Sequence, residues 1–267
     1  MRVRRVITTR SGGASRAPYD SFNLSAGVGD DPRAVRLNRR RLATAIGLTE
    51  ATVHWMRQVH GTGVAVVPGP GDGAAEHDGV TEHDGATEHD GAAEHDGAAE
   101  HDGAAEHDGV DAMVTDRPGI ALAVLSADCV PLLLADPVAG VIGAAHAGRV
   151  GAASGVLAST LEAMRTLGAR PERTEVLLGP AVCGGCYEVP AAMRDAVGAV
   201  LPGSACRTRA GTPGLDLRAG LRSQLAALGV SRVDTDPRCT MEDPVLYSHR
   251  RDGLTGRLAA LTWLDRG

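Results

Sequence analysis

Aromatic side chains make up only 2% of this 267-residue chain, and lysine is absent. So few rings leave no platform on which the bases of a single nucleic-acid strand could stack. The 27 basic residues are all arginine, and apart from Arg39–Arg41 and Arg250–Arg251 they are scattered along the chain. The sequence therefore predicts no nucleic-acid partner.

The chain also lacks an apolar run long enough to cross a membrane, which takes about 20 residues. Its most apolar region, residues 120–146, is interrupted by Asp128, Pro131 and Asp136. Three of the first six residues are arginine, and this start has no apolar stretch of signal-peptide length. The five cysteines have irregular spacing, which indicates free or metal-bound thiols in a reducing compartment. We expect a cytoplasmic protein with no membrane partner.

What the sequence has in excess is the tetrad Glu-His-Asp-Gly, which occurs six times at a six-residue period between residues 76 and 109. The repeat holds 12 of the 33 acids, so the rest of the chain carries 21 acids against 27 arginines despite a net charge of −6. Its side chains are too small and polar to offset the entropy of ordering them. We expect residues 76–109 to be a low-complexity, disordered insertion whose histidines bind metal only weakly.

Hydrophobic periodicity indicates both helices and strands outside the repeat. Apolar residues at helical spacing predict helices over residues 38–46, 150–167, 190–200 and 217–228. Short runs rich in Val, Ile and Leu predict strands at residues 3–8, 64–67, 120–125, 132–135, 141–145, 175–178 and 258–263. Strands mixed with helices, without a linker outside the repeat, predict a single α/β domain spanning residues 1–267.

Three residues with metal-binding side chains stand at the ends of apolar runs, each within two residues of Gly or Pro. They are His60 in QVHG, Cys129 in ADCVP and His146 in AAHAG. Thiolate and imidazole suit zinc, and three protein ligands leave a fourth position open for chemistry. Because the three lie 69 and 17 positions apart, the fold would have to assemble the site.

The motifs around these residues cover nearly the whole chain. In order they are TTRSGGASRAPYDSFNLSAGVGDD, QVHG, DAMVTDRPGIALAVLSADCVPLLL, AAHAG, LLGPAVCGGCYEV, LDLR and YSHRRDGLTGR. Together they resemble the laccase-domain family, once described as polyphenol oxidases, now as purine nucleoside phosphorylases with adenosine deaminase activity, and also named peptidoglycan editing factor. The resemblance implies a mixed-sheet α/β sandwich in which His60, Cys129 and His146 bind a catalytic Zn2+, or Cu2+ in the oxidase description. It also implies that adenosine, inosine or methylthioadenosine and phosphate are the substrates.

Four further residues are expected to support the chemistry. Arg10 could bind an anion through its guanidinium, and Gln58, close to His60, could hydrogen-bond the base. Asp128 is expected to orient a ligand or transfer a proton. Where the family has AHAG-Trp-Arg-Gly this chain has Gly148-Arg149-Val150-Gly151, so Arg149 is expected to replace the displaced arginine at the substrate. His249 stands where the family commonly has tyrosine.

Cys183 and Cys186 form a CxxC motif, which is typical of a redox pair or of half a zinc ribbon. A ribbon needs a second pair, and Cys206 and Cys239 lie 33 positions apart. A thioredoxin-type motif would open a helix, which this one does not. Since the resembled family has a cysteine beside the tyrosine of CYEV, Cys186 is expected to be structural or to line the pocket, and Cys183 to be incidental.

The sequence is also compatible with other functions. Cys129 could be the nucleophile of an amidase that edits cell-wall precursors, with a histidine as base. The repeat could make the chain a metal-buffering protein. A copper-dependent polyphenol oxidase is disfavoured because only four histidines, at positions 54, 60, 146 and 249, lie outside the repeat. We expect a monomer.

Overall fold

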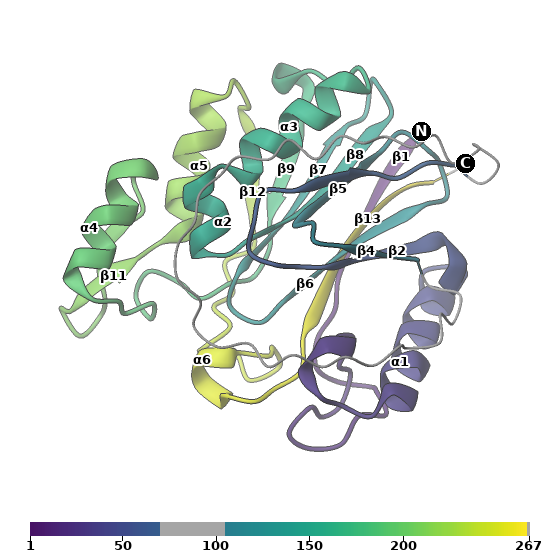
Figure 1. Ribbon diagram of the computed structural model, residues 1–267, viewed down its shortest axis with the longest axis horizontal. Coiled ribbons are helices and arrows are strands. Elements are labelled where there is room, and N and C mark those ends of the chain that lie inside the picture. Colours follow the sequence, from purple (N-terminus) through teal and green to yellow (C-terminus); the bar gives the residue numbers. More distant parts are fainter. Residues whose placement is uncertain (70–104, 266–267) are drawn as a thin grey trace.

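Two mixed β-sheets face each other and carry helices on both outer sides in the computed structural model, which describes residues 1–69 and 105–265 (Figure 1). The five-stranded sheet contains, in spatial order, β1 (Arg2–Ile7), β13 (Leu258–Asp265), β6 (Ala121–Ser126), β2 (Val53–Arg57) and β4 (Ala105–Asp108). The six-stranded sheet contains β12 (Arg232–Thr235), β9 (Glu175–Leu178), β7 (Val130–Asp136), β8 (Val141–Ala147), β5 (Ala112–Thr115) and β3 (Val64–Val66).

The core between the sheets is built from aliphatic side chains of both. Leu122 of β6 meets Met113, Leu133 and Ile142 of the six-stranded sheet, and all four are fully buried. Strands buried on both faces read as continuous apolar runs, which explains why β6, β7 and β8 were visible in the sequence, although the short β5 was not. Residues 127–129 carry the chain from β6 in one sheet to β7 in the other, and this crossing contains Cys129.

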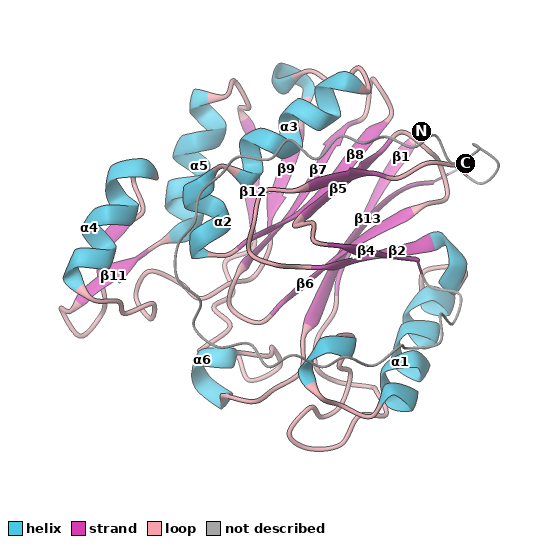
Figure 2. Ribbon diagram, viewed as in Figure 1, coloured by secondary structure: helices cyan, strands magenta, loops and turns pink. Residues whose placement is uncertain are grey.

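Helices cover the outer faces of the sandwich (Figure 2). The helices α2 (Arg149–Ser154), α3 (Val156–Thr166) and α5 (Leu217–Ala227) belong to the core on the six-stranded side, and α1 (Pro32–Ala45) to the core on the five-stranded side. Outside these layers lie α4 (Ala191–Val200), the hairpin of β10 (Ala205–Arg207) and β11 (Pro213–Leu215), and the short α6 (His249–Asp252).

The expected α/β sandwich in a single domain is confirmed, with differences in its details. Residues 150–167 form two helices instead of one, because Gly155 at φ 97° caps α2 in the left-handed conformation and starts α3. The helix expected at residue 38 begins at Pro32, where Asp31 accepts a hydrogen bond from the backbone of Arg33. Several strands were not predicted: β2, β4, β5, β10, β11 and β12.

The last tetrad of the repeat is part of the sheet. Ala105–Asp108, expected within the disordered insertion, instead form β4 parallel to β2. Glu106 pairs with the largely buried Arg39 at 2.7 Å, and His107 Nε2 lies 3.0 Å from His54 Nδ1. The remainder of the predicted insertion, residues 76–104, lies outside the described residues.

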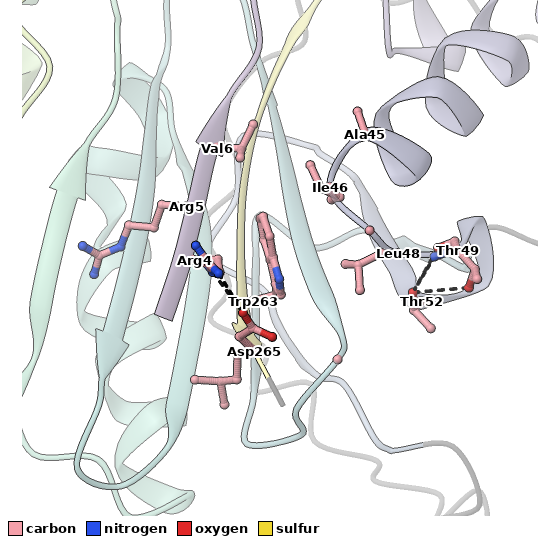
Figure 3. A pocket seen from close by; sticks show the side chains of 13 residues that line it. Arg4, Arg5, Val6, Ala45, Ile46, Leu48, Thr49, Thr52, Trp263 and Asp265 are labelled. Atoms are coloured by element: carbon pink, nitrogen blue, oxygen red, sulfur yellow. Dashed lines mark hydrogen bonds and ion pairs between the residues drawn. The ribbon is translucent and has the colours of Figure 1, made fainter. Parts of the chain in front are cut away.

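A surface cavity of about 680 Å³ lies beside the end of α1 and strands β1 and β13 (Figure 3). Its lining includes Ile46, Trp263 and the ion pair of Arg4 with Asp265. Because Trp263 pairs with Ala121 at the start of β6, the cavity lies at the opposite end of that strand from Cys129. Within the described ranges, no helix is long and apolar enough to span a membrane.

Candidate metal centre and active site

Three separate loops and strand ends bring His60, Cys129 and His146 together. His60 follows β2, Cys129 precedes β7, and His146 lies near the end of β8. Their ligand atoms all lie within 4.8 Å of one another, with 3.9 Å between Cys129 Sγ and His60 Nε2. The two imidazole rings meet edge to face with centroids 4.8 Å apart. The structure thus gathers the three predicted ligands; their binding of metal stays a prediction.

The backbone at this site is held in unusual conformations. His60 has φ 62° and Asp128 has φ 102°, a region that residues other than glycine rarely adopt. The His60 loop is held by the carboxylate of Asp111, which accepts hydrogen bonds from three consecutive N–H groups, those of Val59, His60 and Gly61. Such strain persists only where the surroundings enforce it, and it is common where a side chain must be aimed at a ligand.

Asp111 also orients His146. Its Oδ1 lies 2.8 Å from His146 Nδ1, and its backbone carbonyl accepts the N–H of His146 at 2.7 Å. Because an ionised carboxylate only accepts hydrogen bonds, Nδ1 carries the proton and Nε2 is left to face Cys129 and His60. A carboxylate behind a ligating histidine is the usual support of a metal site. The sequence pattern did not single out Asp111, which stands two residues after the end of the repeat and immediately before β5.

The protonation equilibria of the cluster are coupled. Burial by itself would raise the pKa of Cys129, but the positive charge and hydrogen bond of His146, helped by His60, lower it to about 6. Burial opposes protonation of His146, but the Cys129 thiolate and Asp111 raise its pKa to about 9. Burial likewise works against ionisation of Asp111, yet its bonds to His146 and to the His60 loop lower the pKa of this carboxyl. Without metal, the centre is therefore a thiolate–imidazolium pair at neutral pH.

Glycine at position 148 permits the close approach of the chain to two of these side chains. A Cβ there would lie 2.8 Å from His60 Cδ2 and 3.0 Å from Cys129 Sγ. A Cβ at Gly151, in the first turns of α2, would lie 2.9 Å from the carbonyl oxygen of Gly61. All three distances are shorter than van der Waals contact, so the start of α2 is packed directly on the cluster and the His60 loop.

The donor set fits a single divalent ion. One thiolate and two imidazoles match the ligand preference of zinc or copper, and Asp111 supplies the expected carboxylate behind one histidine. His60 is exposed, Cys129 is half-buried and His146 is buried, so the cluster opens to solvent on the His60 side. A fourth ligand of the ion would therefore approach from the His60 side.

Asp128 does not have the position that was expected of it. Its Oδ1 accepts hydrogen bonds from the hydroxyls of Thr240 at 2.6 Å and Ser248 at 2.7 Å, and its Oδ2 accepts the backbone N–H of Arg250 at 2.7 Å. The carboxylate therefore fastens the loop after β12 and the start of α6 to the turn that carries Cys129. The carboxylate that contacts two of the candidate ligands, His60 and His146, is that of Asp111.

The remaining predicted residues lie in different settings. Gln58 exchanges two hydrogen bonds with the backbone of Leu125, at 2.9 and 2.8 Å, which hold its amide against β6. The guanidinium of Arg10 faces the carboxylates of Asp20 and Asp252, each at 3.6 Å, and already has anionic partners. Arg149 follows Gly148 and is half-buried, three residues after His146.

The family model described as multi-copper polyphenol oxidoreductase laccase matches residues 4–265. The chain belongs to this family. A protein of Mycobacterium tuberculosis named purine nucleoside phosphorylase is 50% identical over 265 residues, which cover 99% of this chain and 93% of that protein. A protein of the same name from Corynebacterium glutamicum is 48% identical, over 99% of this chain and 95% of that protein.

Solved structures in this family share the fold. The Neisseria meningitidis protein NMB0706 is 34% identical, with a TM-score of 0.77 over 98% of this chain and 94% of that one. YlmD from Geobacillus stearothermophilus is 32% identical, with a TM-score of 0.80 over 99% and 92%. The resemblance seen in the sequence motifs is thus confirmed.

The family description mentions several copper ions, but the histidines are few. In the part of the chain that the structure describes, the His60 cluster is the one group of metal-ligating residues that includes histidine. His54 is engaged with His107, and His249 Nδ1 lies 2.8 Å from the carbonyl oxygen of Gly253. The histidines of the described residues therefore offer a site for one ion and no arrangement resembling a three-copper cluster.

Proposed function

We propose that this chain is a zinc-dependent purine nucleoside phosphorylase that also deaminates adenosine. The observation that carries the proposal is the convergence of His60, Cys129 and His146 within 4.8 Å, in a chain 50% identical to a protein named purine nucleoside phosphorylase. Adenosine, inosine and methylthioadenosine are the proposed nucleosides. We favour zinc over copper because three protein ligands with an open position are usual for catalytic zinc.

In phosphorolysis, an oxygen of phosphate bonds to C1′ of the ribose while the bond from C1′ to the purine nitrogen breaks. The electron pair leaves with the purine, which then takes up a proton. When bound, a divalent ion supplies a positive centre that binds and polarises an oxygen ligand. In deamination, water adds at C6 of adenosine and ammonia leaves, so both reactions require an oxygen nucleophile beside the nucleoside.

The chain's own residues hold and shape this site. Asp111 keeps the proton of His146 on Nδ1 and thereby leaves Nε2 as a donor atom. Gly148 keeps the space beside His60 and Cys129 clear of a side chain. Arg149, the next residue, is the proposed partner of phosphate, since a guanidinium fork matches phosphate oxygens.

The proposed enzyme acts on small molecules in the cytoplasm as a monomer. Few aromatic residues and scattered arginines support the expectation that nucleic acid is not a partner.

The test is a product analysis with purified protein, inosine or adenosine, and phosphate. We expect ribose 1-phosphate and free base to form only when phosphate is present, and inosine to form from adenosine with or without phosphate. Cys129→Ala should lower both activities by about 100-fold or more, because the thiolate ligand is lost. Cys206→Ser, a cysteine outside the cluster, is the matched control and should retain both. Base release without any phosphate dependence would contradict phosphorolysis.

A second function is favoured by one observation. Without metal, Cys129, His146 and Asp111 form a row of thiolate, imidazolium and carboxylate. Cysteine hydrolases use this arrangement to activate the nucleophilic thiolate. Such an enzyme would cleave an amide, as in the editing of cell-wall precursors. Chelation separates the two functions: a zinc enzyme loses activity and regains it with zinc, whereas a cysteine hydrolase is active without metal and inhibited by it.

A further inference from the structure

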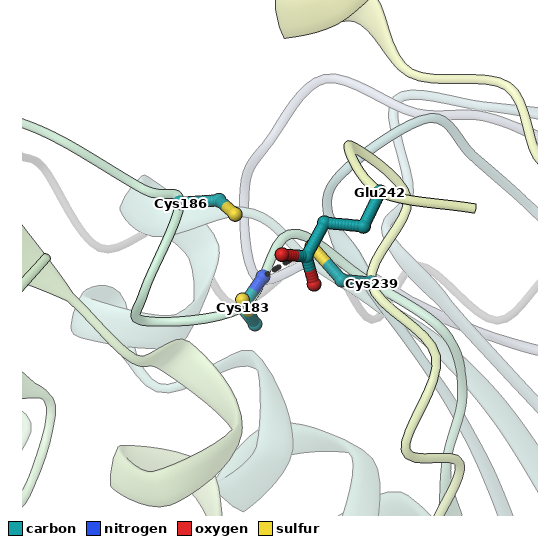
Figure 4. A group of neighbouring side chains, drawn as sticks. All are labelled: Cys183, Cys186, Cys239 and Glu242. Carbon is teal, nitrogen blue, oxygen red and sulfur yellow. Dashed lines mark hydrogen bonds between the residues drawn. The ribbon is translucent and has the colours of Figure 1, made fainter. Parts of the chain in front are cut away.

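Two turns far apart in sequence present a second set of metal-binding side chains. Cys183 and Cys186 lie in the loop after β9, and Cys239 and Glu242 lie in the loop after β12. Their sulfur and carboxylate atoms lie within 4.8 Å of one another, and Figure 4 shows them converging on a common point. All five cysteines of the chain are free thiols in this structure.

The two turns have the same construction. In the first, the carbonyl of Cys183 accepts the N–H groups of Cys186 and Tyr187, both at 2.9 Å; in the second, the carbonyl of Cys239 accepts those of Glu242 and Asp243, at 3.1 and 2.9 Å. Each turn therefore offers two ligands separated by two residues, which is the spacing of ligand pairs in structural zinc sites. The second pair is not visible as a CxxC motif, because its second ligand is Glu242 and not a cysteine.

The distances and charges suit a tetrahedral ion. With zinc–sulfur bonds of about 2.3 Å, sulfurs in a tetrahedral site lie about 3.8 Å apart, so a small closure of the present cluster suffices. The N–H of Cys183 donates to Cys239 Sγ at 3.3 Å, and Arg209 Nη1 donates to Cys186 Sγ at 3.4 Å. Arg209 also pairs with Glu242, so a cation behind the ligands offsets their excess negative charge.

The surroundings are built for this arrangement. In the Cys-Gly-Gly-Cys turn, a Cβ at Gly184 would lie 2.8 Å from Asp216 Cβ, and one at Gly185 would lie 3.2 Å from Arg209 Cγ. A side chain at position 184 would therefore overlap Asp216, and one at position 185 would displace the side chain of Arg209. Cys239 is buried and Glu242 is exposed, so the cluster reaches the surface on the Glu242 side.

We propose that Cys183, Cys186, Cys239 and Glu242 hold a structural zinc ion, separate from the His60 cluster. All four positions are filled by the protein, as in sites that stabilise a fold and do not react. The ion fastens the loop after β9 to the loop after β12. Thr240, next to Cys239, donates to Asp128, and Val182, next to Cys183, donates to the Asp128 carbonyl at 3.0 Å. The structural ion thereby supports the turn that carries Cys129.

The test is cobalt binding to the full chain, prepared without metal and under reducing conditions. The background variant is Cys129→Ala, which removes the thiolate of the His60 cluster. The histidine-rich repeat contains no cysteine, so thiolate-to-cobalt charge-transfer absorption then reports the second cluster and not the repeat. We expect such absorption, saturating at about one cobalt ion per chain and bleached by zinc. The matched control is Cys206→Ser on the same background, which should leave the absorption unchanged.

Two variants locate the ligands. Cys186→Ser should remove about a third of the sulfur absorption and weaken cobalt binding at least about 10-fold. Glu242→Gln leaves every thiol in place, so it keeps the absorption but should weaken binding by about 10-fold; it remains informative if Cys186→Ser does not fold. Absence of sulfur-to-cobalt absorption in Cys129→Ala would overturn the proposal, and so would cobalt binding by Cys186→Ser or Glu242→Gln that is as tight as in Cys129→Ala itself. So would a Cys183–Cys186 disulfide in protein purified with zinc and reductant.

Discussion

Asp111 Oδ1 lies 2.8 Å from His146 Nδ1, and the same carboxylate accepts the backbone N–H groups of Val59, His60 and Gly61. One side chain thus fixes two of the three proposed metal ligands, the ring of His146 and the loop of His60. Cys129, the third, is positioned independently by the crossing between the sheets. Asp111 is therefore the residue on which the geometry of the centre most depends.

Replacing this carboxylate should weaken metal binding more than it disturbs the fold. In Asp111→Asn the amide cannot accept all the N–H groups that the carboxylate accepts, so we expect a loss of about 10–100-fold in zinc affinity, measured by competition with a chromophoric chelator. Unfolding free energy should fall by about 1–3 kcal/mol. Asp116→Asn, at an exposed carboxylate beside Arg117, is the control and should bind zinc normally. Equal affinities of the two variants would contradict the role of Asp111.

A methyl group at position 148 should disturb the centre through space alone. Gly148 has φ −74°, which alanine adopts freely, so Gly148→Ala brings no backbone strain. Its Cβ would nevertheless overlap His60 and Cys129. We expect about 10-fold weaker zinc binding in a protein that still unfolds cooperatively. The control Gly27→Ala, whose Cβ meets only Ser25 Oγ at 4.0 Å, should match the parent; unchanged affinity in Gly148→Ala would show that the space is not needed.

The pKa of Cys129 predicts how the metal-free protein reacts with alkylating agents. Because the His146 imidazolium stabilises the thiolate, the alkylation rate of Cys129 should rise with pH through a midpoint near 6 and then level off. In His146→Ala burial acts without that cation, so the midpoint should move above the ordinary value of about 8.5. Mass spectrometry assigns the modified residue, and Cys186, whose pKa burial and neighbouring thiols raise to about 11, should react last. A midpoint near 8.5 in the parent would contradict the ion pair.

The end of the repeat should contribute to stability. Arg39 packs over Trp55 at 4.2 Å and pairs with Glu106 at 2.7 Å, and its burial lowers the pKa of the guanidinium despite that partner. Glu106→Gln leaves this charge without its counter-ion, so we expect a loss of about 1–3 kcal/mol in urea unfolding. Glu162→Gln, which breaks the exposed pair with Arg165, is the control and should change little. Equal stability of both variants would show that β4 is not needed.

The strongest signals in the sequence were those that depend on local pattern. Runs such as Ala121–Ser126 and Val130–Asp136 are buried on both faces, so their apolar character alone identified them as strands. β2 was missed because Val53–Arg57 alternates buried residues with His54 and Arg57. β4 was missed because its sequence repeats that of the preceding tetrads, and only pairing with β2 distinguishes it.

The types of the side chains identified the candidate site better than their positions in the sequence did. Thiol and imidazole side chains at strand ends identified Cys129, His60 and His146, whose meeting depends on both sheets. Carboxylates carry no comparable signal. Asp128 was expected behind the ligands and instead binds Thr240, whereas Asp111, adjoining the acidic repeat, was not distinguished from it.

Metal dependence of phosphorolysis is the most direct test of the whole account. Metal-free protein should release no hypoxanthine from inosine and phosphate, and added zinc should restore the rate in proportion to the ion bound by the His60 cluster. In Cys129→Ala no concentration of zinc should restore it. Full activity of the metal-free protein, or activity of Cys129→Ala within about 3-fold of the parent, would contradict the claim that this thiolate and the two imidazoles hold a catalytic ion.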